Sequence, residues 1–250
     1  MFKAVKANNV AELKVLLNKD GIDVNATTTG LFDSGRTALH LATENGNTEC
    51  VGLLLAHKNI DVNARTINGV LNLGDYTPLH LAAASGKTEC LRLLLSASGI
   101  DVNSQTTGGM MKGMTPLHSA VDTGTIECVK LLLEHRGIDV NVQNEKGLTA
   151  LHLAVENVFT GWVRELLSDK RINVDIATNK GETHLKLAEH SDNAHKQEIL
   201  SLLQFHRKIK QDQVTFNSKA DSTSPFSSKH YLVVLFIFLL IVCVVVVLHK

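Results

Sequence analysis

Four histidines and three cysteines recur along the chain at intervals that could bring metal-binding side chains into register. The histidines are His40, His80, His118 and His152, and the cysteines are Cys50, Cys90 and Cys128. Zinc prefers such imidazole and thiolate ligands, but they must lie ~2 Å from the ion. Side chains one structural unit apart are separated by ~8–10 Å, and metal motifs cluster more closely in sequence. We therefore expect structural histidines, and cysteines buried as small apolar residues in a reducing compartment.

No other residue pattern points to catalysis or to cofactor binding. A nucleophile, a base and an orienting residue cannot be assembled, and no GxxxxGK[ST] phosphate loop occurs. The pair Gly108–Gly109 lacks the flanking strand and helix that a dinucleotide loop requires. Lys+Arg and Asp+Glu number 25 each, so no basic excess favours nucleic acid. The sequence predicts a protein that is not an enzyme and takes no cofactor or small-molecule substrate.

The histidines belong to a repeated motif, which sets the elements that position them. The chain reads TALHLA at 37–42, TPLHLA at 77–82, TPLHSA at 115–120, TALHLA at 149–154 and a degraded THLKLA at 183–188. Each of the first four copies is followed, 24 residues after its Thr, by Asp-Val-Asn or Asn-Val-Asp. All variation in length falls between that tripeptide and the next Thr. The constant part is therefore the packed part, and the variable part is a surface loop.

One copy illustrates the unit. Thr115 can cap a helix with Pro116 at its first position, and Gly124 can end that helix. A second helix follows, with Val129, Leu132 and Leu133 at helical spacing. The chain then extends into a loop, here called a finger; fingers one to five are residues 25–37, 63–77, 103–115, 141–149 and 175–183. The Asn that opens each of the first four fingers (Asn25, Asn63, Asn103, Asn141) is interpreted as local turn chemistry.

The T-P-L-H-x-A motif, the Gly between helices, the Leu run and the closing Asp-Val-Asn resemble the ankyrin repeat. The resemblance covers residues 1–206, with units near 1–25, 37–63, 77–103, 115–141, 149–175 and 183–206. It implies an all-α solenoid of about six helix pairs with β-hairpin fingers and a concave face. It also implies that the motif His ties each unit to its neighbour by hydrogen bonds. Long sequence repeats of this kind stack into such solenoids.

Three units depart from the pattern. The first has Asn8 where Gly would stand, and the last has Lys186 in place of the motif His and a polar second helix. Both suit end units that face water. The fifth unit has Val158 at the Gly position and Trp162 in the cysteine position, so we expect an altered turn there.

Fingers one to three are the informative variation. They run 12, 14 and 12 residues from Asn to Thr, whereas fingers four and five run eight. Long loops in compact domains are often functional, and exposed apolar side chains suit protein docking. The alternative is that neighbouring fingers pack on each other. The candidate partner-binding residues in the fingers are Leu31, Phe32, Arg36, Leu71, Leu73, Tyr76, Met110, Met111 and Met114.

The ends of the first helices would also face a partner. Three of them carry an acidic residue, Glu44, Asp122 and Glu156. We add these to the candidate partner-binding set, and they favour a partner with a basic patch.

The C-terminal tail differs in character. Residues 207–230 are polar and without helical periodicity, which predicts a flexible linker. Residues 231–248 carry no charge and would reach ~27 Å as a helix, just enough for a bilayer core of ~30 Å. The start of the chain lacks a signal-peptide core, and basic residues precede the apolar stretch. We expect a single C-terminal transmembrane helix with the repeats on the cytoplasmic side.

Two functions fit these elements. The first is a membrane-tethered scaffold that recruits a cytoplasmic protein partner through its long fingers and concave face. The second is a regulatory subunit of a membrane protein complex that assembles through the C-terminal helix. The repeats also resemble ankyrin proteins of intracellular bacteria, which act as effectors in some cases, and the membrane would then be a host-cell membrane.

Overall fold

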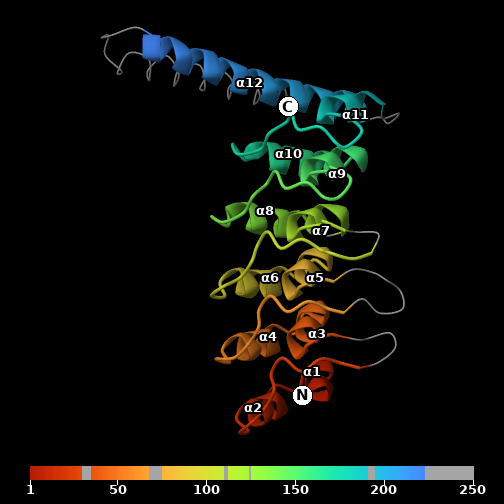
Figure 1. The fold of residues 1–250 in the computed structure, drawn as a ribbon, viewed down its shortest axis with the longest axis vertical. Coiled ribbons are helices and arrows are strands. Elements are labelled where there is room, and N and C mark those ends of the chain that lie inside the picture. Colours follow the sequence, from red (N-terminus) through yellow and green to blue (C-terminus); the bar gives the residue numbers. More distant parts are fainter. Residues whose placement is uncertain (30–34, 68–74, 110–111, 124, 191–194, 223–250) are drawn as a thin grey trace, which may run out of the picture. The chain divides into compact units, whose positions relative to one another are not determined.

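The computed structural model describes residues 1–29, 35–67, 75–109, 112–123, 125–190 and 195–222, without the side chains of 216–222. Its regular elements are all helices, in an order that alternates a first and a second helix of each unit (Figure 1). They are α1 (Phe2–Lys6), α2 (Val10–Leu17), α3 (Ala38–Asn45), α4 (Thr48–Leu55), α5 (Pro78–Ala84), α6 (Thr88–Leu95), α7 (Pro116–Thr123), α8 (Ile126–Glu134), α9 (Ala150–Glu156), α10 (Thr160–Ser168), α11 (His184–His190) and α12 (Lys196–Ser222). The predicted all-helical solenoid of six pairs is confirmed.

Residues Met1–His206 form one compact unit, in which the helix pairs stack in chain order (Figure 1). The first helices pack in the row α1, α3, α5, α7, α9, α11, and the second helices pack in the row α2, α4, α6, α8, α10. Each layer therefore contacts the layers before and after it, and no layer buries its apolar face alone. Residues Arg207–Lys250 form a separate unit, of which 207–222 are described.

The core is a column of aliphatic side chains repeated layer by layer. Leu39, Leu79, Leu117 and Leu151 from the first helices are fully buried, as are Leu54, Leu94, Leu132 and Leu166 from the second helices. Cys50, Cys90 and Cys128 are also buried in it. Burial raises the pKa of the Cys50 and Cys90 thiols, so both behave as small apolar side chains.

The motif Thr and His start the first helices α3, α5, α7 and α9, and three of the four histidines also join their unit to the next. Thr77 accepts from the backbone N–H of His80, and the His80 ring accepts from the Thr77 N–H, which completes a capping box. The other ring nitrogen, Nε2, lies 3.0 Å from the carbonyl oxygen of Met114 in the next unit. His40 and His118 make the same contact with the carbonyls of Tyr76 and Leu148. In these three histidines both ring nitrogens are engaged, as the family resemblance implied, whereas the buried Nε2 of His152 has no hydrogen-bond partner among the described residues.

A second ladder runs along the start of the fingers. Asn63 donates from Nδ2 to the Gly99 carbonyl at 2.7 Å and accepts from the Asp101 N–H at 2.9 Å. The same pair of bonds to the following unit is made by Asn25, Asn103 and Asn141. The interpretation of these asparagines as local turn residues was therefore wrong. The local turn is closed instead by the preceding Asp, for example Asp61 with the Asn63 N–H.

The turn between the helices of the fifth unit is retained. Val158 has φ +58°, close to the +64° of Gly86, and the Phe159 N–H bonds to the Ala154 carbonyl at 2.9 Å, as Lys87 does to Ala82. The expected alteration of this turn was wrong. A β-branched residue in the left-handed region is strained, so the surrounding layers impose this conformation on Val158.

The prediction of a flexible linker over 207–230 is corrected in its first part. Helix α12 continues through residues 207–222. This stretch has no Gly or Pro and several good helix formers, and extending an existing helix needs no new nucleus. Among the described residues, no helix combines the length and apolar character needed to cross a membrane. The predicted span 231–248 lies outside the described residues.

The described parts of the fingers are bonded to one another. They contain isolated antiparallel bridges, such as Thr27–Thr37, and no regular strand, so β-hairpin fingers stay a prediction. Asp75 in finger two is buried and accepts from the Thr107 Oγ1 at 2.6 Å and from the N–H groups of Thr107 and Gly108 in finger three. Arg65 pairs with Asp75 at 3.0 Å. Burial alone would raise the pKa of Asp75, but these bonds hold it below its ordinary value.

The buried histidines predict a loss of stability in mild acid. Burial lowers the pKa of His40, His80 and His118 to about 4, whereas the unfolded chain binds these protons near pH 6.5. The contribution of these neutral histidines to the free energy of unfolding is therefore fully present above pH ~6.5. It falls as the pH drops toward 4, by ~2 kcal/mol per histidine between pH 7 and pH 5. Urea titrations across this range should show the fall. His80→Gln should flatten the dependence, and an unchanged pH profile would contradict the assignment.

The hydrogen bonds of Asp75 predict that its replacement lowers the free energy of unfolding more than the replacement of an exposed aspartate does. Asp75→Ala leaves the Thr107 and Gly108 N–H groups without their acceptor, so the free energy of unfolding should fall by ~2 kcal/mol. Hydrogen exchange at those two amides should also accelerate. Asp23→Ala, which removes an exposed carboxylate bonded within its own turn, is the control. Equal losses in the two variants would show that Asp75 does not join the fingers.

Candidate functional site

The candidate site is a row of paired positions, here called the docking face. Each pair consists of the residue just before the Thr that closes a finger and the residue eight positions later, near the end of the following first helix. Arg36 forms an ion pair with Glu44, and Glu182 lies 4.0 Å from His190. At the two ends of the row, the charged side chains are therefore engaged with each other. Between them lie the pairs Tyr76–Ala84, Met114–Asp122 and Leu148–Glu156.

The middle of the docking face is hollowed. A recess of about 340 Å³ lies between fingers three and four and the ends of α7 and α9. Its apolar lining comes from Met114, Leu148 and Leu153, and its acidic groups are Asp122, Glu145 and Glu156. Lys112 forms an ion pair with Glu145 at the rim. The recess thus combines an apolar floor with charged walls, an arrangement that suits an amphipathic side chain.

Two carboxylates give the docking face its charge. Asp122 is half-buried and Glu156 is exposed, and neither forms an ion pair or accepts a hydrogen bond within the described chain. Glu44, by contrast, is occupied by Arg36. The sequence grouped these three acidic residues together, whereas the structure separates one paired carboxylate from two that are available to a partner.

Tyr76 and Met114 have structural roles that their sequence did not indicate. The carbonyl of each accepts from the motif His of the preceding unit. The Tyr76 ring stays half-exposed and meets the His80 ring edge-on, with centroids 5.9 Å apart, and burial is the main cause of its raised pKa. Met114 is only 4% exposed, so it belongs to the floor of the recess and not to the exposed tip of the finger. Its position next to the buried Thr115 places it in the core.

The structure brings together some of the predicted residues and leaves others undescribed. Arg36, Glu44, Tyr76, Asp122 and Glu156 line the docking face. The finger residues Leu31, Phe32, Leu71, Leu73, Met110 and Met111 lie outside the described residues. Within the described residues, no three His, Cys, Asp or Glu side chains gather closely enough to hold a metal ion.

Sequence reasoning missed the charged rim and the ties between fingers. Lys112, Glu145 and Lys146 line the recess, and Gln105 donates to the Gln143 carbonyl in the next finger at 3.0 Å. The partners are more than 30 residues apart. A signal existed in the repeat alignment, because Arg65, Gln105 and Gln143 all stand two residues after their finger's Asn.

Comparison with known proteins agrees with this architecture. The crystal structure of EF0377, an ankyrin repeat protein, superposes with a TM-score of 0.66 and 26% identity, covering 80% of this chain and 94% of that one. An ankyrin repeat domain from Acinetobacter baumannii AYE gives a TM-score of 0.67 and 27% identity, covering 82% and 96%. Both are similar over the repeats.

Curated relatives match over shorter stretches. Cortactin-binding protein 2 of Ornithorhynchus anatinus is 42% identical over 55 residues, and the nuclear factor NF-kappa-B p105 subunit of Gallus gallus is 44% identical over 69 residues. These matches take 22% and 28% of this chain, but 3% and 7% of the length of the two relatives. They are therefore similar in repeats and not in the whole protein.

Sequence models of the repeat itself cover most of the chain. A model of ankyrin repeats in three copies matches residues 1–66 and 66–144, and a model of ankyrin repeats in many copies matches residues 132–188. Together with the stacked helix pairs and the His ladder, these matches establish that the chain belongs to the ankyrin-repeat family of protein–protein interaction scaffolds.

Proposed function

We propose that the protein is a membrane-tethered scaffold that recruits a cytoplasmic protein partner through its long fingers and its docking face. One observation carries the proposal. The same chain contains a repeat domain with an open docking face and, after it, an uncharged stretch of 18 residues, 231–248. Recruitment to a surface raises the effective concentration of a partner and requires no catalytic group.

The charge of the docking face supports a basic partner. Asp122 and Glu156 line the apolar recess, and neither forms an ion pair within the described chain. A lysine or arginine of a partner would gain a charge-assisted hydrogen bond there, and its methylene stem would cover Leu148 and Leu153. Hydrogen bonds of Asp75, Gln105 and Gln143 fix the described parts of neighbouring fingers to each other. The fingers therefore hold the residues of the docking face in a fixed arrangement.

The tail supports membrane attachment. Residues 231–248 are long enough to cross a bilayer core, and Arg207, Lys208 and Lys210 precede them. Basic residues on the N-terminal side favour a cytoplasmic position for the repeats. Helix α12 carries the chain to Ser222, and eight residues then lead to the apolar stretch.

Alkaline extraction of membranes tests the tether. Full-length protein should stay in the membrane pellet, whereas a chain that ends at Ser228 should be released into the supernatant. Leu240→Arg is the matched control, because a charge at the centre of the span costs ~2.5–3.5 kcal/mol and should lower the membrane-bound fraction. Release of the full-length chain as readily as the truncated one would contradict the spanning helix.

Exchange of finger tips tests recruitment. Residues 28–35, 66–75 and 106–113 are each replaced by the four-residue tip 144–147 of finger four, which gives all three fingers the length of eight. Affinity capture from lysates of the source cell should then lose a partner that the natural chain retains. The control variant receives the same tip at 178–181 of finger five, where the length is unchanged, and should keep the partner. Retention by both variants would assign the long fingers to packing alone.

A further inference from the structure

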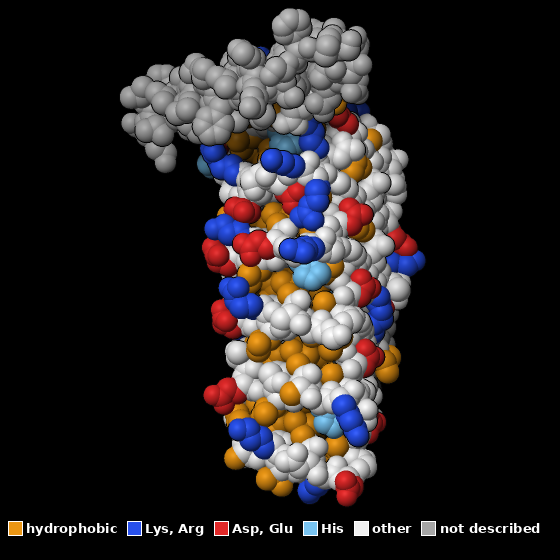
Figure 2. All heavy atoms as spheres, turned by 90° about the vertical axis from the view of Figure 1, so that its left-hand side faces the viewer, with side chains coloured by type: hydrophobic (Ala, Val, Ile, Leu, Met, Phe, Trp, Pro, Cys, Tyr) orange, Lys and Arg blue, Asp and Glu red, His pale blue; other side chains and the backbone are white. Residues whose placement is uncertain are grey.

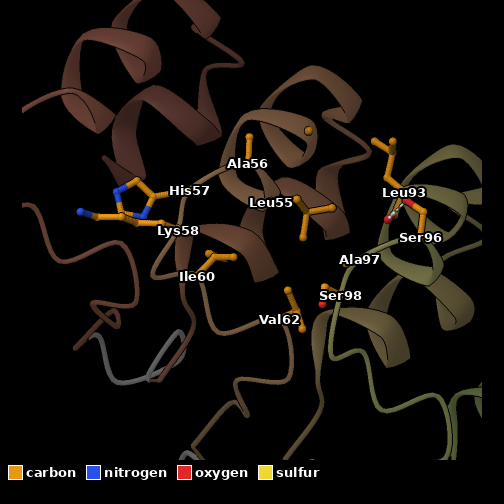
Figure 3. Close-up of a pocket in the computed structure, with 11 residues that line it drawn as sticks. Leu55, Ala56, His57, Lys58, Ile60, Val62, Leu93, Ser96, Ala97 and Ser98 are labelled. Atoms are coloured by element: carbon orange, nitrogen blue, oxygen red, sulfur yellow. Dashed lines mark hydrogen bonds between the residues drawn. The ribbon is translucent and has the colours of Figure 1, made fainter.

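The face opposite the fingers carries a second and larger hollow. Figure 2 shows apolar side chains gathered in bands across this face, with charged side chains between them. A hollow of about 600 Å³ lies between the ends of α4 and α6. In Figure 3, Leu55, Ile60 and Val62 lie on one side of it, and Leu93 and the segment Ser96–Ser98 lie on the other.

Two glycines, Gly52 and Gly99, leave this junction open. Gly52 occupies the position in α4 that Arg92, Lys130 and Arg164 occupy in α6, α8 and α10. A Cβ added at Gly52 would meet no atom within 4 Å, and the same is true at Gly99, beside the hollow. At Gly137, the equivalent of Gly99 one unit later, a Cβ would lie 3.3 Å from the His135 ring. The space beside Gly99 is therefore open, whereas the equivalent space beside Gly137 is taken by the His135 ring.

The junction between α8 and α10 shows what such a place can hold. Arg171 stands there at the position of Gly99, and its guanidinium donates to the carbonyls of Leu133 at 2.7 Å and Ile138 at 3.2 Å. Asp169 holds the same guanidinium through Nε at 3.0 Å. Leu133 lies in the last turn of α8, where carbonyls lack intrahelical donors and carry the negative end of the helix dipole.

The corresponding acceptors in the open hollow are the carbonyls of Leu55 and Ile60. They keep the spacing of Leu133 and Ile138 along the chain, and neither accepts a hydrogen bond from a described residue. Leu55 is the last residue of α4. The walls formed by Leu55, Ile60 and Leu93 are apolar, so they would cover the methylene stem of a long cationic side chain.

We propose that this hollow is a docking site for an arginine side chain of a protein partner, whose guanidinium takes the place that Arg171 fills within the chain. The site rests on the proposed function in one respect only, namely that the occupant belongs to a recruited protein. It adds a contact surface on the face opposite the fingers. A partner that reaches both surfaces would be held by two separate contacts along the solenoid.

The charges around the hollow are compatible with a guanidinium. His57 and Lys58 line its rim, but Lys58 corresponds to Arg136, which coexists with Arg171 in the occupied junction. Asp61 corresponds to Asp139, an acidic residue whose charge raises the pKa of Arg171 after the larger effect of the Asp169 hydrogen bond. The one missing group is a counterpart of Asp169, because Ala97 stands in its place.

The test is a titration of the full-length, isotope-labelled protein in detergent micelles with N-acetyl-L-arginine amide, followed by NMR. The carbonyl carbons of Leu55 and Ile60 should shift saturably, with a dissociation constant of the order of 1 mM for so small a ligand. N-acetyl-L-citrulline amide has the same shape without the charge and should bind at least several-fold more weakly. Equal binding of the two, or no saturable shift at Leu55 and Ile60, would overturn the proposal.

Three variants separate the site from general effects on folding. Gly52→Arg should fill the hollow and abolish the shifts, whereas Gly52→Ala removes the same helix-interior glycine and should leave them. Ala97→Asp supplies the carboxylate that Asp169 provides in the occupied junction, so it should tighten binding several-fold. Unchanged binding in Gly52→Arg or in Ala97→Asp would contradict the assigned position. The titration involves no membrane and no cellular partner, so its outcome is independent of the tether and of the fingers.

Discussion

The hydrogen bond from the motif histidines His40, His80 and His118 to a carbonyl of the next unit is the interaction on which the arrangement depends. The donor is a ring nitrogen in the first helix of one unit. The acceptor is the carbonyl oxygen of Tyr76, Met114 or Leu148, near the end of the following finger. These same residues belong to the docking face. The spacing of the layers and the position of the partner-binding residues are therefore set by one contact, repeated, and a change that weakens it alters both.

Burial makes this contact durable at neutral pH. The imidazoles of His40, His80 and His118 are enclosed by aliphatic layers, which favours the neutral ring. In that form Nδ1 can accept from Thr while Nε2 donates across the layer boundary. The asparagine ladder completes the connection on the other side of each unit. Neighbouring units are thus joined by polar bonds at two places, with an aliphatic core between them.

Much of the fold could be predicted because each sequence feature of the unit occurs in several copies along the chain. The phase of TPLH and the constant distance to Asp-Val-Asn located the helix pairs and the fingers. Long-range partners could not be read in the same way: nothing local marks Asp75 as the acceptor of Thr107, or Asn63 as the partner of Gly99. The burial of Met114 could not be predicted either, because an apolar residue near the end of a finger can point to the core or to solvent. The end of α12 was missed because a polar helix lacks an apolar stripe.

The candidate sites follow from positions at which the repeats differ. A solenoid holds its backbone nearly constant from unit to unit, so one substitution changes the local surface without changing the frame. Arg171 closes one junction and Gly99 leaves another open; Glu44 is neutralised by Arg36, whereas Asp122 is left available. Partner choice can therefore reside in a few surface positions while the buried Leu, Thr and His stay the same. The chain serves as its own reference, because an occupied junction shows the chemistry that an open one offers.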